Sequence, residues 1–81
     1  MEKRLYEMKT GDRAEIIRSC HGEKAMTRRL YELGFSGGAG VSCVGESPLG
    51  GMKAYLVKGA VIALRDKDAA AISVEVVSQG R

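Results

Sequence analysis

Three cysteine and histidine side chains, Cys20, His21 and Cys43, could contribute to a metal site. Thiolate and imidazole groups are preferred ligands of zinc, but a zinc site normally takes four ligands, often in close pairs with defined spacing. Three are present here at most, which favours packed thiols and an exposed loop histidine over a metal site. A weak transition-metal site that a carboxylate or a second molecule completes remains as the alternative.

The sequence offers few residues that could catalyse a reaction. His21 is the only histidine, and no nucleophile, base and orienting group occur at the spacing of a catalytic motif. The glycines between Gly34 and Gly40 lack both the lysine and the strand-to-helix setting of a phosphate-binding loop. We therefore expect a protein that is not an enzyme and that holds no cofactor, apart from the weak metal site considered above.

Length and composition predict one domain that spans residues 1–81. The chain carries 13 Lys and Arg against 10 Asp and Glu, and these charges alternate along the sequence and form no basic block. The first residues are charged where a secretory signal is apolar, and the apolar run from Ala60 to Leu64 is far below the ~20 residues of a spanning helix. We expect a cytoplasmic protein with reduced cysteines and no direct membrane insertion.

Hydrophobic periodicity predicts a mainly β protein with five strands. The predicted strands cover Arg13–Ser19, Gly40–Glu46, Met52–Val57, Ala60–Arg65 and Ile72–Val77, with a helix over Glu23–Leu33 and a helical turn over Asp66–Ala71 that Asp66 caps. This order is typical of a small SH3-like five-stranded barrel. One amphipathic helix is inserted between the first two strands, and the short helical turn precedes the last.

The longer helix has a clear apolar face and a clear end. Met26, Leu30 and Leu33 recur at the spacing of one helix face. Gly34 suits the left-handed residue that ends a helix, and Phe35 after it can fold back on Leu30. The sequence therefore predicts that this helix packs against the barrel through that face.

The two strands around Lys58-Gly59 predict a tight hairpin. A two-residue connection places Tyr55 opposite Ile62 on one face and Leu56 opposite Val61 on the other. Both faces are then largely apolar, so both need cover, which a closed barrel with a helix or a partner outside would supply.

Nucleic-acid binding is an alternative function, because small barrels often bind RNA or DNA. Such proteins usually carry a basic stripe with aromatic stacking platforms, whereas this chain has one Arg28-Arg29 pair, scattered charges and no tryptophan. These residues favour a helix with its charged side in water over a nucleic-acid surface. The four aromatic residues are also too few for the groove that recognises proline-rich peptides.

One succession of residues runs over nearly the whole chain. It comprises Leu5, Met8 and Gly11, then Arg29-Leu30-Tyr31-Glu32-Leu33-Gly34-Phe35, Gly38 to Val41, Pro48-Leu49-Gly50, Ile62-Ala63-Leu64-Arg65, Ala69 and Ile72. In combination this pattern resembles the ferrous iron transport protein A (FeoA-like) family. The resemblance implies an SH3-like cytoplasmic protein that acts with the membrane ferrous iron transporter B, which carries a GTPase domain. It implies neither transport nor enzymatic activity of its own.

The resulting hypothesis is a regulatory module of iron uptake that docks on the cytoplasmic region of the transporter and binds no nucleic acid. Candidate contacts are Pro48, Leu49 and Met52 at a turn, Tyr55 on the adjoining strand, and Arg28 and Tyr31 on the helix. Core packing is at least as plausible for Met52, Tyr55 and Tyr31 taken singly. The alternatives are a small barrel that binds nucleic acid and a metal carrier, and the residues specify no oligomeric state.

Overall fold

The structure, a computed structural model, describes residues 1–80. Its elements in chain order are β1 (Glu2–Arg4), the 3-10 helix η1 (Leu5–Glu7), β2 (Arg13–Ser19), α1 (Lys24–Glu32), β3 (Gly40–Glu46), β4 (Met52–Val57), β5 (Ala60–Arg65), α2 (Asp66–Ala69) and β6 (Ile72–Ser78). The mainly β prediction is confirmed. Within residues 1–80, no helix is long and apolar enough to cross a membrane.

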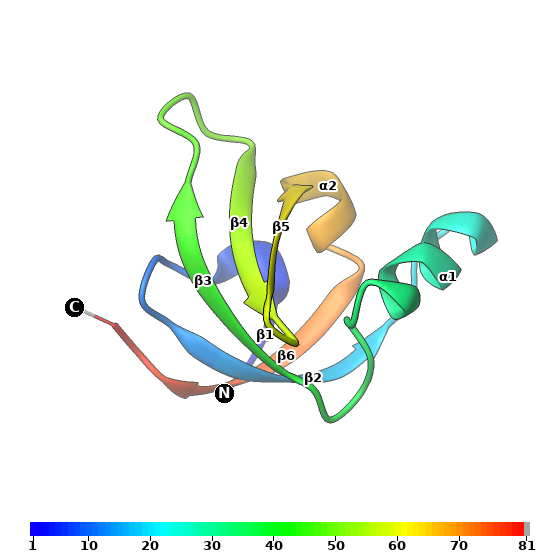
Figure 1. The fold of residues 1–81 in the computed structure, drawn as a ribbon, viewed down its shortest axis with the longest axis horizontal. Coiled ribbons are helices and arrows are strands. Elements are labelled where there is room, and N and C mark those ends of the chain that lie inside the picture. The colour runs from blue at the N-terminus through cyan, green and yellow to red at the C-terminus, as the bar shows by residue number, and fades with distance from the viewer. Residues whose placement is uncertain (81) are drawn as a thin grey trace.

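The six strands form one curved antiparallel sheet in the order β1-β6-β2-β3-β4-β5 (Figure 1). The prediction of five strands is wrong by one, because β1 pairs with β6 through Glu2, Lys3 and Arg4. Three charged residues show no apolar alternation, so this strand depends on backbone pairing that side-chain patterns do not report. The first strand of the chain therefore lies beside the last one, β6.

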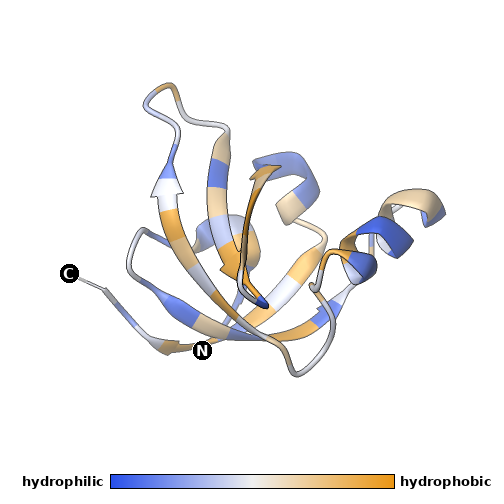
Figure 2. Ribbon diagram, viewed as in Figure 1, coloured by the Kyte–Doolittle hydropathy of each residue, from blue (hydrophilic) through white to orange (hydrophobic). Residues whose placement is uncertain are grey.

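The core lies on the inner face of the curved sheet. Its buried hydrophobic residues are Leu5, Met8, Ala14, Ile16, Leu30, Phe35, Val41, Cys43, Tyr55, Val57, Leu64, Ala69, Ile72 and Val74. They come from every element except β1, and Figure 2 shows the hydrophobic segments distributed along the strands that enclose this core. Burial of their side chains supplies the main stabilising free energy of so small a fold.

Helix α1 packs and ends as predicted, with bounds one residue shorter at each side. Met26, Leu30 and Leu33 all contact the core cluster. Gly34 has φ of +111° and donates its N–H to the Tyr31 carbonyl at 3.1 Å, while the Phe35 N–H reaches the Leu30 carbonyl at 3.0 Å. These two hydrogen bonds are a Schellman motif, which returns the chain toward the core.

The β4–β5 hairpin has the predicted register, with Tyr55 opposite Ile62 and Leu56 opposite Val61. Its turn residues Lys58 and Gly59 both have positive φ, as a two-residue hairpin turn requires. The face carrying Tyr55 is buried, whereas Val61 on the outer face is 64% exposed. No element of residues 1–80 provides the cover predicted for that outer face.

The capping prediction for α2 is wrong by one position. Arg65 is the N-cap residue, and its side chain makes no cap hydrogen bond. Asp66 is instead the first residue inside the helix. A carboxylate there still faces the positive end of the helix dipole.

Candidate functional site

An irregularity in β2 creates the main surface feature of the protein. Ile16 pairs with Val74 and Arg18 pairs with Ser73, so Ile17 is an extra residue, a β-bulge. In a regular strand the side chain of Arg18 would point to the same buried face as that of Ile16. The extra residue at the bulge reverses this alternation for the residues that follow it. Arg18 therefore lies in solvent.

Pairing between β2 and β3 ends close to the bulge. The last register pair is Glu15 with Gly40, followed by hydrogen bonds of Ile16 with Gly38 and Ala39. Past Ile16, β2 has no further partner on β3, and α1 lies beside the end of β2 instead (Figure 1). A groove remains between the strand end and the helix.

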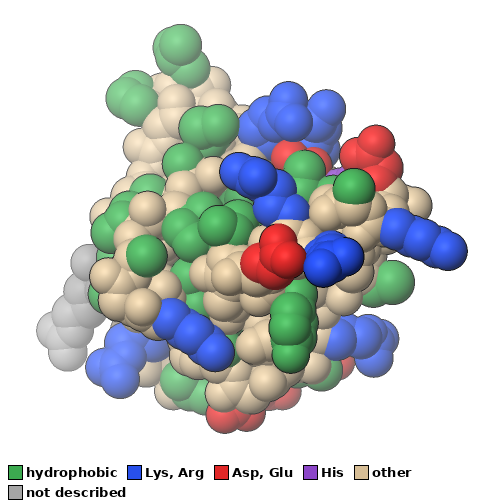
Figure 3. Space-filling model, turned by 45° about the vertical axis from the view of Figure 1, so that its right-hand side comes forward, with side chains coloured by type: hydrophobic (Ala, Val, Ile, Leu, Met, Phe, Trp, Pro, Cys, Tyr) green, Lys and Arg blue, Asp and Glu red, His purple; other side chains and the backbone are tan. Residues whose placement is uncertain are grey.

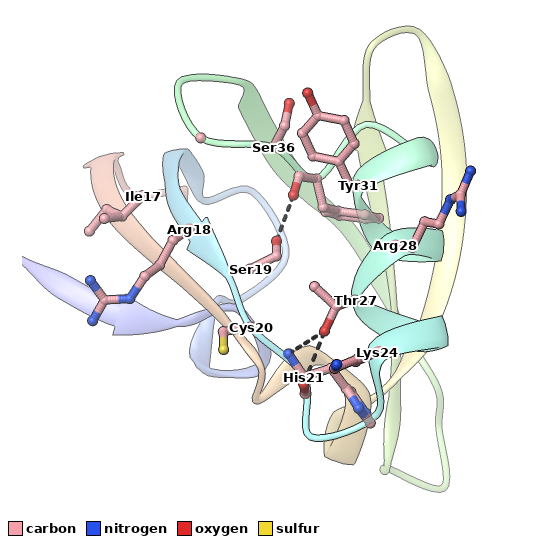
Figure 4. Close-up of a pocket in the computed structure, with 12 residues that line it drawn as sticks. Ile17, Arg18, Ser19, Cys20, His21, Lys24, Thr27, Arg28, Tyr31 and Ser36 are labelled. Carbon is pink, nitrogen blue, oxygen red and sulfur yellow. Dashed lines mark hydrogen bonds between the residues drawn. The ribbon is translucent and has the colours of Figure 1, made fainter.

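The groove has a volume of about 620 Å³, and all its lining residues lie between positions 17 and 37 (Figure 4). Ile17 and Ser19 belong to the β2 wall, and Thr27 and Tyr31 belong to the α1 wall. Phe35, which is fully buried, also lines it. One continuous stretch of chain thus forms the whole site.

Internal hydrogen bonds fix the two walls relative to each other. The Ser19 hydroxyl donates to the Phe35 carbonyl, and the Thr27 hydroxyl accepts the His21 N–H at 2.9 Å. A Cβ on Gly37 would lie 2.9 Å from the Ile17 carbonyl oxygen, so only glycine permits this approach of the loop to β2. The hydroxyls of Ser19 and Thr27 are consequently occupied by partners within the protein.

His21 links the groove to α2. Its Nε2 lies 3.1 Å from Oδ1 of Asp68, and its Nδ1 accepts the Glu23 N–H at 3.0 Å, which places the ring proton on Nε2. Arg65 donates to the other carboxylate oxygen of Asp68 at 3.3 Å. The expectation of an exposed loop histidine is therefore wrong, because a buried carboxylate holds the ring.

Two buried carboxylates make stability depend on pH. The hydrogen bond from His21 holds the pKa of Asp68 below its ordinary value of 3.8, with a further contribution from Arg65 and against the effect of burial. The Lys9 N–H, aided by the Gly80 N–H, likewise lowers the pKa of Asp12 against the effect of burial. Both groups therefore bind protons more readily in the unfolded chain.

We expect full stability well above pH 3.8 and a loss of stability as the pH falls through that value toward the lower pKa values of the folded state. Urea unfolding across this acidic range should show a falling midpoint. The double variant Asp12→Asn with Asp68→Asn should be less stable at neutral pH but lose less on acidification. An equal acid loss in the double variant would contradict the assignment to these two groups.

The structure does not bring the three metal-candidate residues together. Cys43 is buried on β3 beside Asp12, at the start of β2, and burial raises the pKa of its thiol. Cys20 follows the opposite end of β2 and is exposed, so it is not the packed thiol that the sequence favoured. Within residues 1–80, no group of three His, Cys, Asp or Glu side chains is arranged to hold a metal ion.

The residues predicted to bind a partner do not form one surface. They lie at the β3–β4 hairpin, on α1 and, in one case, in the core. Leu49, 98% exposed, lies with exposed Pro48 and 39%-exposed Met52 at the β3–β4 hairpin, where Figure 3 shows hydrophobic side chains at the tip. Tyr55 is a correction: it is fully buried and meets Phe35 edge to face, with ring centroids 6.4 Å apart. The predicted pairing of Tyr55 with Ile62 is confirmed, but Tyr55 lies on the inner face of the hairpin and cannot contact a partner.

Arg28 and Tyr31 lie on α1 beside the groove. Tyr31 is 66% exposed, and Arg28 pairs with Glu32 at 3.3 Å. The sequence analysis did not identify Ile17, Arg18 or Lys24, which also line the groove. The sequence analysis proposed contacts on the helix, which forms one wall, but only the bulge explains how the strand contributes the other.

Comparison with known proteins finds relatives in sequence and in structure. A sequence model described as the FeoA domain matches residues 3–76. An Fe(2+) transport protein A/Fe(2+) transporter FeoB fusion protein of Porphyromonas gingivalis is 37% identical over 75 residues, which cover 93% of this chain and 9% of that protein. The chain thus spans about a tenth of this curated relative.

Two solved structures share the fold and part of the sequence. The FeoA protein of Chlorobium tepidum aligns with a TM-score of 0.86 and 33% identity, over 94% of this chain and 71% of that one. The FeoA of Stenotrophomonas maltophilia, an SH3-domain protein solved with zinc, aligns with a TM-score of 0.75 and 31% identity, over 93% and 89% of the two chains. The SH3-like prediction is thereby confirmed.

Proposed function

Because the chain belongs to the FeoA family, which is associated with ferrous iron transport, we propose that it is an accessory protein of ferrous iron uptake. It acts by docking on the cytoplasmic region of the membrane transporter FeoB and carries out no reaction itself. The observation that carries this proposal is the Porphyromonas gingivalis relative, in which the two proteins are fused in one chain. Fusion keeps the two parts at a high effective concentration relative to each other, which strengthens their association if they bind each other.

The surface of the fold suits a docking role. A sheet with a closely packed core presents side chains on a rigid frame, so little conformational entropy is lost when a partner binds. Two apolar features are available on that frame: the groove beside α1 and the hairpin tip around Leu49. Large exposed apolar side chains at such places are typical of protein contacts.

The first test is the recovery of FeoB from a detergent extract of the native cell by this protein as bait, after nuclease treatment and a salt wash. Leu49→Asp should reduce the recovered FeoB several-fold, because a charge replaces a fully exposed apolar side chain at the tip. The thermal midpoint should stay nearly unchanged, since exposed substitutions usually alter stability by within about 0.5 kcal/mol.

The matched control is Val77→Asp, which places the same charge at another exposed apolar position, on β6. It should leave the recovery of FeoB unchanged. Failure of the unaltered protein to retain FeoB would refute the proposed partnership. Recovery only of nuclease-sensitive material would favour the nucleic-acid alternative.

A further inference from the structure

We propose that the groove between β2 and α1 binds a segment of a partner protein in which a large apolar side chain is flanked by Asp or Glu. The apolar side chain enters beside Tyr31 and Phe35, and the carboxylates pair with Arg18 and Lys24. This inference rests on the proposed docking function and specifies the chemistry of the docked segment.

The apolar part of the argument comes from the walls. Ile17 and Tyr31, which line the groove, are both exposed hydrophobic side chains, and buried Phe35 also lines it. Tyr31 lies on the α1 side of the groove (Figure 4). Withdrawing the exposed parts of Ile17 and Tyr31 from water favours an apolar ligand. A polar ligand would gain no such contribution.

The charged part of the argument comes from the residues around the groove. Arg18, Lys24 and Arg28 all line it, and no acidic side chain does. Arg28 already pairs with Glu32, whereas among residues 1–80 neither Arg18 nor Lys24 has an ion-pair partner. Arg18 lies at the outer edge of the β2 side, with its guanidinium directed away from α1, and Lys24 lies near the start of α1 (Figure 4). Two unpaired cations at the edges of the groove therefore favour a ligand with carboxylates beside its apolar group.

Two polar groups of the walls, the hydroxyls of Ser19 and Thr27, argue against a small polar metabolite. Sites for such molecules present convergent free donors and acceptors in an enclosing cavity. Here the Ser19 and Thr27 hydroxyls bond to the Phe35 carbonyl and to the His21 N–H, and His21 itself holds Asp68. The groove is also open between strand and helix, a shape that accepts a side chain from a longer segment (Figure 4).

A second copy of this chain fits the groove less well than an acidic segment. The most exposed apolar residue, Leu49, is flanked by Pro48 and Gly50 and has no carboxylate beside it. The nearest acidic residue of that hairpin, Glu46, accepts hydrogen bonds from Thr10. The hairpin tip therefore cannot offer the charge pattern that the groove favours.

Fluorescence anisotropy with the full chain and three short labelled peptides tests the proposal. The first peptide carries leucines flanked by glutamates, the second replaces the glutamates with lysines, and the third replaces the leucines with serines. We expect saturable binding of the first peptide alone, weakening as salt rises. No binding of the first peptide, or equal binding of the lysine peptide, would overturn the proposal.

Protein variants locate the binding. Tyr31→Ser should weaken binding of the glutamate peptide about tenfold, as for a central aromatic contact. Lys24→Glu should weaken it about three- to tenfold and reduce its salt dependence. Lys67→Glu, an exposed lysine on α2 outside the groove, is the matched control and should bind normally. Equal losses in Lys24→Glu and Lys67→Glu would place the binding elsewhere.

The same variants separate this inference from the proposed function. If Tyr31→Ser and Lys24→Glu both retain FeoB in the bait experiment, the groove is not the docking site, although the partnership stands. If the unaltered protein fails to retain FeoB but binds the glutamate peptide with the expected variant pattern, the partnership fails and the ligand chemistry of the groove stands.

Discussion

Replacing Phe35 with alanine is expected to lower the free energy of unfolding by about 3 to 5 kcal/mol, the usual cost of removing a buried aromatic ring. Phe35 is fully buried, packs edge to face on Tyr55 and lies beneath the groove. A domain of 81 residues has a total stability of roughly 4 to 12 kcal/mol. The variant should therefore be marginally folded, as urea unfolding would show.

Phe35→Leu is the matched control for that experiment. Leucine retains most of the apolar volume while losing the edge-to-face contact with Tyr55, so it should cost clearly less than alanine. A loss below about 1 kcal/mol in Phe35→Ala would show that the groove collapses to fill the space. The aromatic ring would then not be the support of the site.

Removing the carboxylate of Asp68 is expected to cost about 1 to 3 kcal/mol, the range for leaving buried partners unsatisfied. Asp68→Ala deprives the Nε2 proton of His21 and the guanidinium of Arg65 of their acceptor. His21 in turn positions the start of α1 through the Glu23 N–H. Thermal or urea unfolding at neutral pH would measure this loss.

A double-mutant cycle identifies the source of that loss. If the His21 contact carries it, the losses in Asp68→Ala and His21→Ala should not add, with an interaction free energy of about 0.5 to 3 kcal/mol. Asp68→Asn, which keeps one carbonyl acceptor, should fall between the original protein and Asp68→Ala. Fully additive losses would show that the two residues act on stability independently.

The elements that the sequence predicted well are those specified by neighbouring residues. The end of α1 requires only Gly34 and an apolar residue after it, and the β4–β5 register follows from a two-residue turn at Lys58-Gly59. Both signals are local in the chain. The same local reasoning paired Tyr55 with Ile62 correctly but could not say which face of the hairpin is buried.

The features that the sequence did not predict depend on distant pairing. Strand β1 forms because Glu2 to Arg4 pair with residues 73–75, some seventy positions away, through backbone groups that every residue possesses. The bulge at Ile17 likewise follows from how β2 meets β6. No alternation of residue types within β2 reports the change of face that it causes.

The candidate site could be predicted only in part for the same reason. Arg28 and Tyr31 were identified as candidate contacts because they lie on the predicted amphipathic helix. Arg18 was not, because in a regular strand it would have continued the buried side of Ile16. The α1 wall of the groove could be predicted from the amphipathic pattern of its sequence, whereas the β2 wall depends on the bulge and could not.

The position of β6 between β1 and β2 has a consequence for how the protein forms during synthesis. Until Ile72 to Ser78 have left the ribosome, β1 has no partner strand and one edge of β2 is open. Helix α1 can form from local contacts before that moment, but the β2 wall of the groove takes its final shape only when β6 pairs with β2 and creates the bulge at Ile17. Completion of the sheet then waits for the last strand, so a nascent chain would expose β2 as an unpaired edge, the surface on which misassociation begins.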